Sequence, residues 1–112
     1  MNEIKTQELR SIAPLFRVLG HPVRLQIVNL LNEQPRCVCE IADDLGLNKS
    51  VTSKHLSQLK QVGVVSMDKK GTQVMCSLAM PCVLTMLQCA IHPDSPKYAV
   101  SRPVKLCRKG CE

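Results

Sequence analysis

The strongest constraint on the fold is a segment that predicts two short helices joined by a tight turn. Residues 37–45 predict an amphipathic helix, and Gly46 ends it. Asn48 is a favourable N-cap for a second helix that runs to about Val62. Two short helices in this order are typical of a helix-turn-helix unit.

The flanking segments complete a winged arrangement. Periodicity predicts helices over residues 1–19, 22–35 and 81–91, and strands over 64–67 and 74–78. The two strands enclose a basic turn at residues 69–72. The last helix is apolar over much of its surface, so we expect a second copy of the chain to cover it. The order indicates a mainly α fold with a β-hairpin wing, which forms a dimer through the first and last helices.

Length and charge narrow the class of protein. The chain has 112 residues, which fit one domain, and we place its boundary at residue 92, with an irregular, cysteine-containing tail over 93–112. The net charge of +6 indicates a polyanionic partner, and the 2% content of aromatic residues favours duplex DNA over single strands. Residues 1–11 have no apolar core of a secretory signal, and no segment is long enough to span a membrane. We therefore expect a cytoplasmic protein.

Basic and hydroxyl side chains gather in the first half of the second helix of the predicted unit. In this motif that half enters the major groove, where such side chains reach base edges and phosphates. The basic turn of the hairpin is placed to contact the adjacent backbone. The candidate DNA-binding residues are Lys49, Ser50, Thr52, Ser53, Lys54, His55, Lys60, Lys69 and Lys70. The expected buried side of the same helix consists of Val51, Leu56, Leu59 and Val62.

Four runs together carry a family resemblance. They are LGHPVRL at residues 19–25, CVCEIA at 37–42, SKHL at 53–56 and GVV at 63–65. In this order and spacing the chain resembles the ArsR/SmtB family of bacterial metalloregulatory repressors, from about Ile12 to Leu87. The resemblance implies a homodimer that binds an inverted-repeat operator and leaves it when an inducer binds. Where the family often has an Arg and two Tyr in the wing, this chain has Thr72, Met75 and Cys76.

The Cys37-Val38-Cys39 run is similar to the paired cysteines of arsenic-sensing and cadmium/lead-sensing members of this family. Residues two apart on a regular helix point to opposite sides, so both sulfurs reach one ion only where the helix start is unwound. Binding would then strain the helix that supports the reading helix. Thiolates suit As(III), Sb(III), Cd(II), Pb(II) or cuprous ion better than hard cations.

The other cysteines differ in their expected roles. Arsenic sensors have a third cysteine where this chain has Ala42, and no cysteine precedes Cys37. Cys107 and Cys111 lie in a basic tail, and are candidate additional ligands beside Cys37 and Cys39. Cys76 is expected to be a core residue. Cys82 and Cys89 are expected to be small interface residues, and either could complete a site with the tail.

The leading hypothesis is a transcriptional repressor that a thiophilic ion releases from its operator, with arsenite first and cadmium or lead second. The alternative is a repressor of the same fold that senses redox or persulfide chemistry through two linked thiols. An enzyme is not expected, since there is no Gly-rich phosphate loop, no carboxylate pair in a predicted cleft and no Cys–His couple with an orienting partner.

Overall fold

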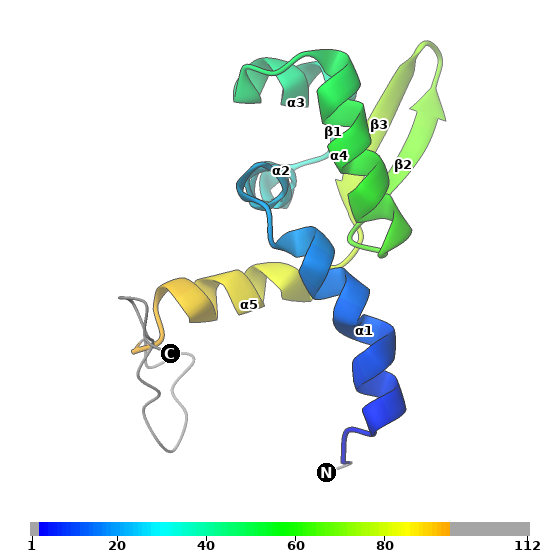
Figure 1. The fold of residues 1–112 in the computed structure, drawn as a ribbon. Coiled ribbons are helices and arrows are strands. Elements are labelled where there is room, and N and C mark those ends of the chain that lie inside the picture. The colour runs from blue at the N-terminus through cyan, green and yellow to red at the C-terminus, as the bar shows by residue number, and fades with distance from the viewer. Residues whose placement is uncertain (1–2, 95–112) are drawn as a thin grey trace. The chain divides into compact units, whose positions relative to one another are not determined.

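A computed structural model describes residues 3–94 of the chain (Figure 1). Its elements in order are α1 (Thr6–Leu19), α2 (Pro22–Glu33), β1 (Arg36–Cys37), α3 (Val38–Leu45), α4 (Lys49–Gln61), β2 (Val65–Lys70), β3 (Gln73–Leu78) and α5 (Cys82–Ile91). The chain divides into two compact units, of which the first ends at Pro81 and the second begins with α5. The predicted order of helices and hairpin is therefore confirmed.

The structure adds one strand to the prediction and moves several element boundaries, two of them at candidate site residues. β1 pairs antiparallel with β3, which gives a three-stranded sheet in the order β1-β3-β2. Helix α3 begins at Val38. Cys37, which the sequence pattern placed inside this helix, therefore precedes it. Lys69 and Lys70 end β2 instead of forming the turn, which contains Gly71 at a φ of +64°.

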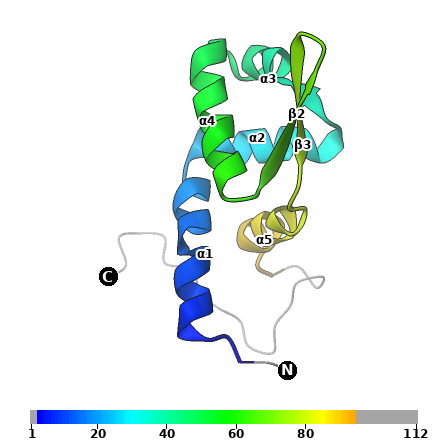
Figure 2. The ribbon, with the colours of Figure 1, turned by 90° about the vertical axis from the view of Figure 1, so that its right-hand side faces the viewer.

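The core of the first unit lies where α2, α3 and α4 meet the sheet. Ile27 of α2, Ile41 of α3 and Leu56 and Leu59 of α4 have no exposed surface, and neither has Val64 just before β2. Figure 2 shows α2 running crosswise between α4 and the hairpin, in agreement with its contacts to both. At roughly 1.5–3 kcal/mol for each large apolar side chain, this burial sets the angles between the three helices.

Helix α1 carries apolar side chains that the described chain does not cover. Ile4 just before the helix, and Leu9, Ile12 and Phe16 within it, are between 43% and 70% exposed. Such a stripe on one helix indicates a surface that another molecule covers. None of the helices within residues 3–94 is long and apolar enough to cross a lipid bilayer.

The start of α4 gives a first test of the fold. Asn48 Oδ1 accepts a hydrogen bond of 2.8 Å from the backbone N–H of Val51 and so caps the helix. We expect Asn48→Ala to lower the free energy of unfolding by about 1 kcal/mol. The matched control is Ser50→Ala, which removes an exposed polar group from the same turn and should change it by less than about 0.5 kcal/mol. Urea unfolding of both variants measures the difference, and equal effects would show that the cap does not stabilise α4.

Candidate nucleic-acid interface and thiol pair

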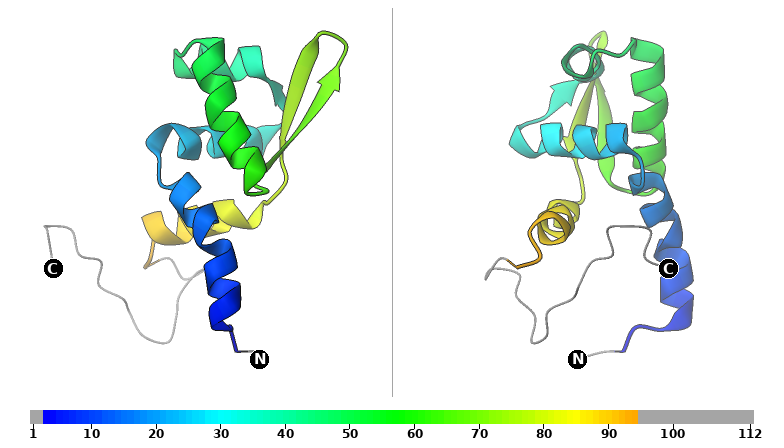
Figure 3. Two further views of the ribbon diagram at one scale, coloured as in Figure 1. Left: turned by 45° about the vertical axis from the view of Figure 1, so that its right-hand side comes forward. Right: turned by 60° about the vertical axis from the view of Figure 1, so that its left-hand side comes forward.

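A tight turn sets the angle between α3 and α4. Gly46 adopts a left-handed conformation with a φ of +67°, which glycine reaches without strain. The backbone N–H of Leu47 donates to the carbonyl of Ala42 over 3.0 Å and so closes the end of α3. In the right panel of Figure 3, α3 is seen nearly end-on while α4 runs in the plane of the picture. The two helices therefore cross steeply, as in a helix-turn-helix unit.

One side of α4 is polar and open to solvent. Lys49, Ser50, Lys54 and Lys60 are exposed, and Ser53 is half-buried. A hollow of about 510 Å³ lies on this side, and α4 supplies six of its seven lining residues: Val51, Ser53, Lys54, His55, Ser57 and Gln58. Ser57 and Gln58 are not among the interface residues expected from the sequence. Their spacing could have indicated them, since residues three and four positions after Lys54 lie on the same face of the helix.

The structure exchanges the expected roles of Val51 and Thr52. Val51 was expected in the core but is 38% exposed, whereas Thr52 is fully buried. The Thr52 hydroxyl donates to the carbonyl of Asn48 over 2.9 Å, so its polar group is satisfied inside the helix. Thr52 is thus a core residue in this structure, and we omit it from the proposed interface.

His55 is half-buried and held by residues of the α2 segment. Its Nδ1 accepts a hydrogen bond of 3.2 Å from Arg24 Nε, and its ring lies 4.7 Å from the ring of His21, centroid to centroid. Burial lowers the pKa of His55, and the charges of His21 and Arg24 lower it further. The imidazole is therefore neutral at pH 7. From its position in the sequence His55 was expected to contact bases, and its hydrogen bond to Arg24 was not expected.

The hairpin presents its lysines at its far end. Lys69 pairs with Val74 and Lys70 with Gln73, so both lysines lie in the last rungs of the sheet and are exposed. Figure 1 shows this end of the hairpin extending away from the helices. An exposed basic tip of this kind is suited to a phosphate backbone.

The cysteines of the CVC run lie where a strand becomes a helix. Cys37 is the N-cap of α3, with φ −79° and ψ 162°, and Cys39 is the second helical residue. Because Cys37 has an extended backbone, the opposite-facing geometry of two helical residues does not apply to this pair. The Cys39 thiol is one of the groups that raise the pKa of Cys37, after burial and Glu40. The two cysteines are therefore neighbours at the start of α3.

Glu40 connects this pair to the helix. Its backbone N–H donates to the Cys37 sulfur, and its carboxylate accepts a 3.1 Å hydrogen bond from the backbone N–H of Cys37. The first of these lowers the pKa of Cys37, but burial, the Glu40 carboxylate and the Cys39 thiol together raise it above its ordinary value. The hydrogen bonds from Cys37 hold the pKa of Glu40 below its usual range. Cys37 is therefore protonated and Glu40 ionised at pH 7.

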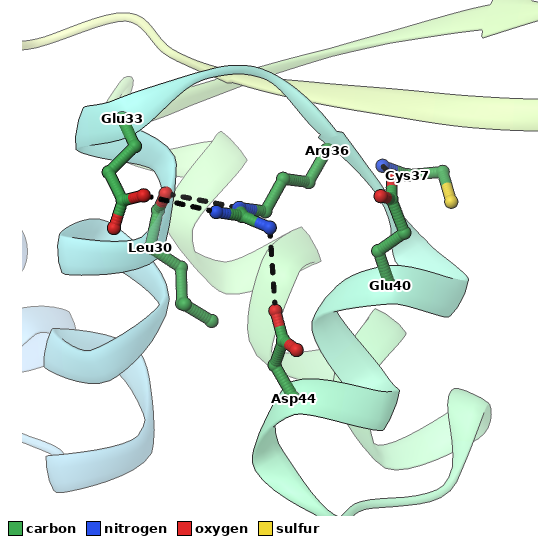
Figure 4. A network of polar contacts seen from close by, with 6 residues as sticks. All are labelled: Leu30, Glu33, Arg36, Cys37, Glu40 and Asp44. Carbon is green, nitrogen blue, oxygen red and sulfur yellow. Dashed lines mark hydrogen bonds and ion pairs between the residues drawn. The ribbon is translucent and has the colours of Figure 1, made fainter.

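Arg36, next to Cys37, ties the same segment to two helices (Figure 4). Its guanidinium donates to the carbonyl of Leu30 over 3.3 Å and lies 3.5 Å from the carboxylates of Glu33 and Asp44. The first two partners belong to α2 and the third to α3. Arg36, which contacts both α2 and α3, is thus the chain neighbour of Cys37.

The remaining cysteines are not gathered with this pair. The register pairs Cys76 with Arg36 and Met75 with Cys37, so Cys76 and Cys37 face opposite sides of the sheet. Cys82 and Cys89 belong to α5, in the second unit. Cys107 and Cys111 lie outside the described residues. Within residues 3–94, no group of three or more His, Cys, Asp or Glu side chains is arranged to hold a metal ion.

Comparisons with known proteins identify the family. Residues 21–67 match the family described as bacterial regulatory protein, arsR family. SmtB of Mycobacterium tuberculosis, an HTH-type transcriptional repressor, is 41% identical over 71 residues, which are 63% of this chain and 53% of SmtB. CadC of Listeria innocua, a cadmium resistance transcriptional regulatory protein, is 32% identical over 83 residues, which are 73% of this chain and 70% of CadC.

The chain belongs to the ArsR family of bacterial regulatory proteins. Its aligned part spans about half the length of SmtB. The solution structure of the homodimeric winged helix-turn-helix DNA-binding domain of Mb0332 from Mycobacterium bovis matches with a TM-score of 0.67 and 25% identity, over 83% of this chain and 95% of that one. The family and the winged helix-turn-helix fold are thereby confirmed, and so is the expectation of a regulatory protein instead of an enzyme.

The thiols differ in accessibility, and this gives a second test. Burial raises the pKa of the Cys76 thiol to about 11, with a further contribution from Cys37, and the side chain has no exposed surface. Cys39 is partly exposed. Since the thiolate is the reactive form, we expect iodoacetamide at pH 8 to modify Cys39 much faster than Cys76 in the native protein. Peptide mass spectrometry over time measures both rates, and the urea-unfolded protein is the control in which they should converge. Equal rates in the native protein would contradict the buried position of Cys76.

Proposed function

We propose that the chain is a DNA-binding transcriptional repressor that reads duplex DNA with α4 and contacts the backbone with the β2–β3 wing. The observation that supports this most is the division of α4 into a buried apolar side and an open side with three lysines, Lys49, Lys54 and Lys60. The steep α3–α4 crossing leaves the open side free for a major groove. The family relationship to SmtB, which is described as a repressor, supports the direction of regulation.

A homodimer is part of this proposal. The open apolar stripe that includes Leu9, Ile12 and Phe16 of α1 provides a surface for a second copy. Mb0332, which has the same fold, is described as homodimeric. The α4 helices of the two chains, about 34–36 Å apart, would enter successive major grooves on one face of the duplex. Because the two chains are related by twofold symmetry, the matching operator is an inverted repeat.

The salt dependence of binding tests the DNA interface. Two copies of Lys49, Lys54, Lys60, Lys69 and Lys70 would neutralise roughly 6–10 phosphates, which gives a log–log slope of affinity against salt of roughly −5 to −9. We expect Lys69→Ala with Lys70→Ala to weaken binding to all sequences alike and to make the slope shallower. Fluorescence anisotropy with operator and random duplexes measures both quantities. A change in which duplex is preferred would show that the wing reads bases.

For the inducer, we propose a thiophilic ion bound by Cys37 and Cys39, with arsenite first and cadmium or lead second. The neighbouring thiols at the start of α3 support a two-thiolate site, because soft ions prefer sulfur ligands. CadC is described as a cadmium resistance regulator, which supports the same ligand class. Cys107 or Cys111 would supply a third thiolate in this proposal.

The position of the pair suggests how binding would reach the DNA interface. Drawing both sulfurs onto one ion would move Cys37 away from the Glu40 N–H and weaken the cap of α3. Because α3 packs on α4 through the turn at Gly46, a change in α3 alters the presentation of α4. An ion releases DNA only through its higher affinity for the DNA-free form, and about 3 kcal/mol of coupling lowers operator affinity on the order of 150-fold.

Serine variants test the sensing site. Serine is close in size to cysteine, is a poor ligand for soft ions, and is a favoured N-cap, so Cys37→Ser keeps the start of α3 intact. We expect Cys37→Ser and Cys39→Ser to bind operator DNA within a few-fold of the wild-type affinity, but to stay bound when arsenite or cadmium is added. Cys82→Ser is the matched control and should respond like the wild type. The measurement is anisotropy of operator DNA titrated with each ion under reducing conditions.

Two further outcomes have a defined meaning. A double Cys37→Ser/Cys39→Ser protein that still releases DNA on addition of arsenite or cadmium would place the sensing site elsewhere. Release by polysulfide or diamide but by neither ion would favour the redox or persulfide-sensing alternative. In that case mass spectrometry would show a covalent link between two thiols instead of a bound ion.

A further inference from the structure

One guanidinium in α2 joins two other helices. Arg24 Nη1 donates to the backbone carbonyl of Val18, in the last turn of α1, over 3.2 Å. Arg24 Nε donates to Nδ1 of His55, in the middle of α4, also over 3.2 Å. The side chain is partly buried, so both bonds are shielded from water. Arg24 and His55 lie 31 positions apart in the sequence.

These bonds determine the chemical state of His55. An imidazole nitrogen that accepts a hydrogen bond carries no proton, so neutral His55 has its proton on Nε2. The neighbouring His21 is also held in place, since its Nδ1 accepts a hydrogen bond of 3.1 Å from the backbone N–H of Val23 and caps α2. Protonation of His55 on Nδ1 would place two donors against each other and break its bond to Arg24.

We propose that Arg24 is a positioning residue for DNA recognition, which acts through His55 by fixing α4 to the end of α1 and by holding the imidazole with its proton on Nε2. The inference rests on the proposed function, because it concerns how α4 is presented to DNA. It changes the expected role of His55 from a base-reading side chain to the group through which α4 is held.

The position of the link explains why it matters for DNA binding. Arg24 and His55 both line the hollow on the open side of α4, beside Ser53, Lys54 and Gln58. Val18 follows the apolar stripe of α1 that the proposed dimer covers. The planar guanidinium of Arg24 therefore connects α1, which carries the proposed dimer surface, to α4, which reads DNA in the proposed function. Without the Arg24 link, α4 could change its angle relative to α1. The two α4 helices of a dimer would then no longer fit both half-sites of an operator at the same time.

The first measurement needs no DNA. Burial lowers the pKa of His55 most, and the two groups that face its ring, His21 and Arg24, lower it further. In Arg24→Gln the charge and the Nε–H that donates to Nδ1 are both removed, so a nitrogen-15 NMR titration should show a higher pKa for His55 and a mixture of ring tautomers. Arg17→Gln removes the same charge from an exposed position in α1 and should leave His55 unchanged. Arg24→Lys keeps the charge, cannot form both bonds, and should give a smaller rise.

The second measurement is a double-mutant cycle on DNA binding. The duplex is one selected from a random-sequence pool by the wild-type protein. We expect Arg24→Gln and His55→Phe each to weaken binding about tenfold or more, the size of one hydrogen bond to a charged group. The double variant should be no weaker than the weaker single variant, within about twofold, because both changes remove the same link. Arg17→Gln should stay within about threefold of the wild type.

Three outcomes would overturn the inference. The first is an unchanged pKa and tautomer of His55 in Arg24→Gln. The second is a double variant whose loss is the product of the single losses, which would make His55 and Arg24 independent DNA contacts. The third is normal DNA binding by a folded Arg24→Gln protein. If Arg24→Gln does not fold, as judged by circular dichroism, Arg24→Lys and His55→Phe carry the test. A wild-type protein that binds no duplex would overturn the proposed function instead, and the NMR result would still stand.

Discussion

The packing of α2, α3 and α4 on one another is the constraint on which every other feature of the first unit depends. Ile27, Ile41 and Leu56 meet at this junction and have no exposed surface. A well-packed core has few alternative arrangements, so these contacts set the overall angle of α4, and the Arg24–His55 bond then joins the helix to the α2 segment. The lysines of α4 are then displayed on a surface whose orientation the core determines.

Much of the fold followed from local signals, and the exceptions have physical causes. Gly46 and Asn48 mark the turn by backbone conformation and capping, which are properties of the residues themselves. The strand β1 has only two residues, Arg36 and Cys37, so it carries no alternating pattern. It exists because β3 has a free edge to pair with, and that edge is a product of the tertiary fold.

Three residues of the candidate site, Thr52, His55 and Cys37, differ from their expected placement because of hydrogen bonds that no periodic pattern reports. Thr52 was expected on the surface because its side chain is polar, but its hydroxyl bonds back to the carbonyl of Asn48 and leaves the methyl group for the core. The bond between Arg24 and His55 spans two helices, and no periodicity within either helix reports it. Cys37 was assigned to a helix because cysteine is an unusual cap, and its true position became visible only with the Glu40 hydrogen bond.

The open apolar stripe on α1 has a consequence for how the protein responds to its own abundance. In the proposed dimer a second chain covers Leu9, Ile12 and Phe16, so the concentration of the DNA-binding dimer varies with the square of the free chain concentration. Below the dissociation constant of the pair, halving the number of chains would reduce the number of pairs about fourfold. Occupancy of an operator would therefore fall more steeply than the protein level as the cell dilutes the chain by growth.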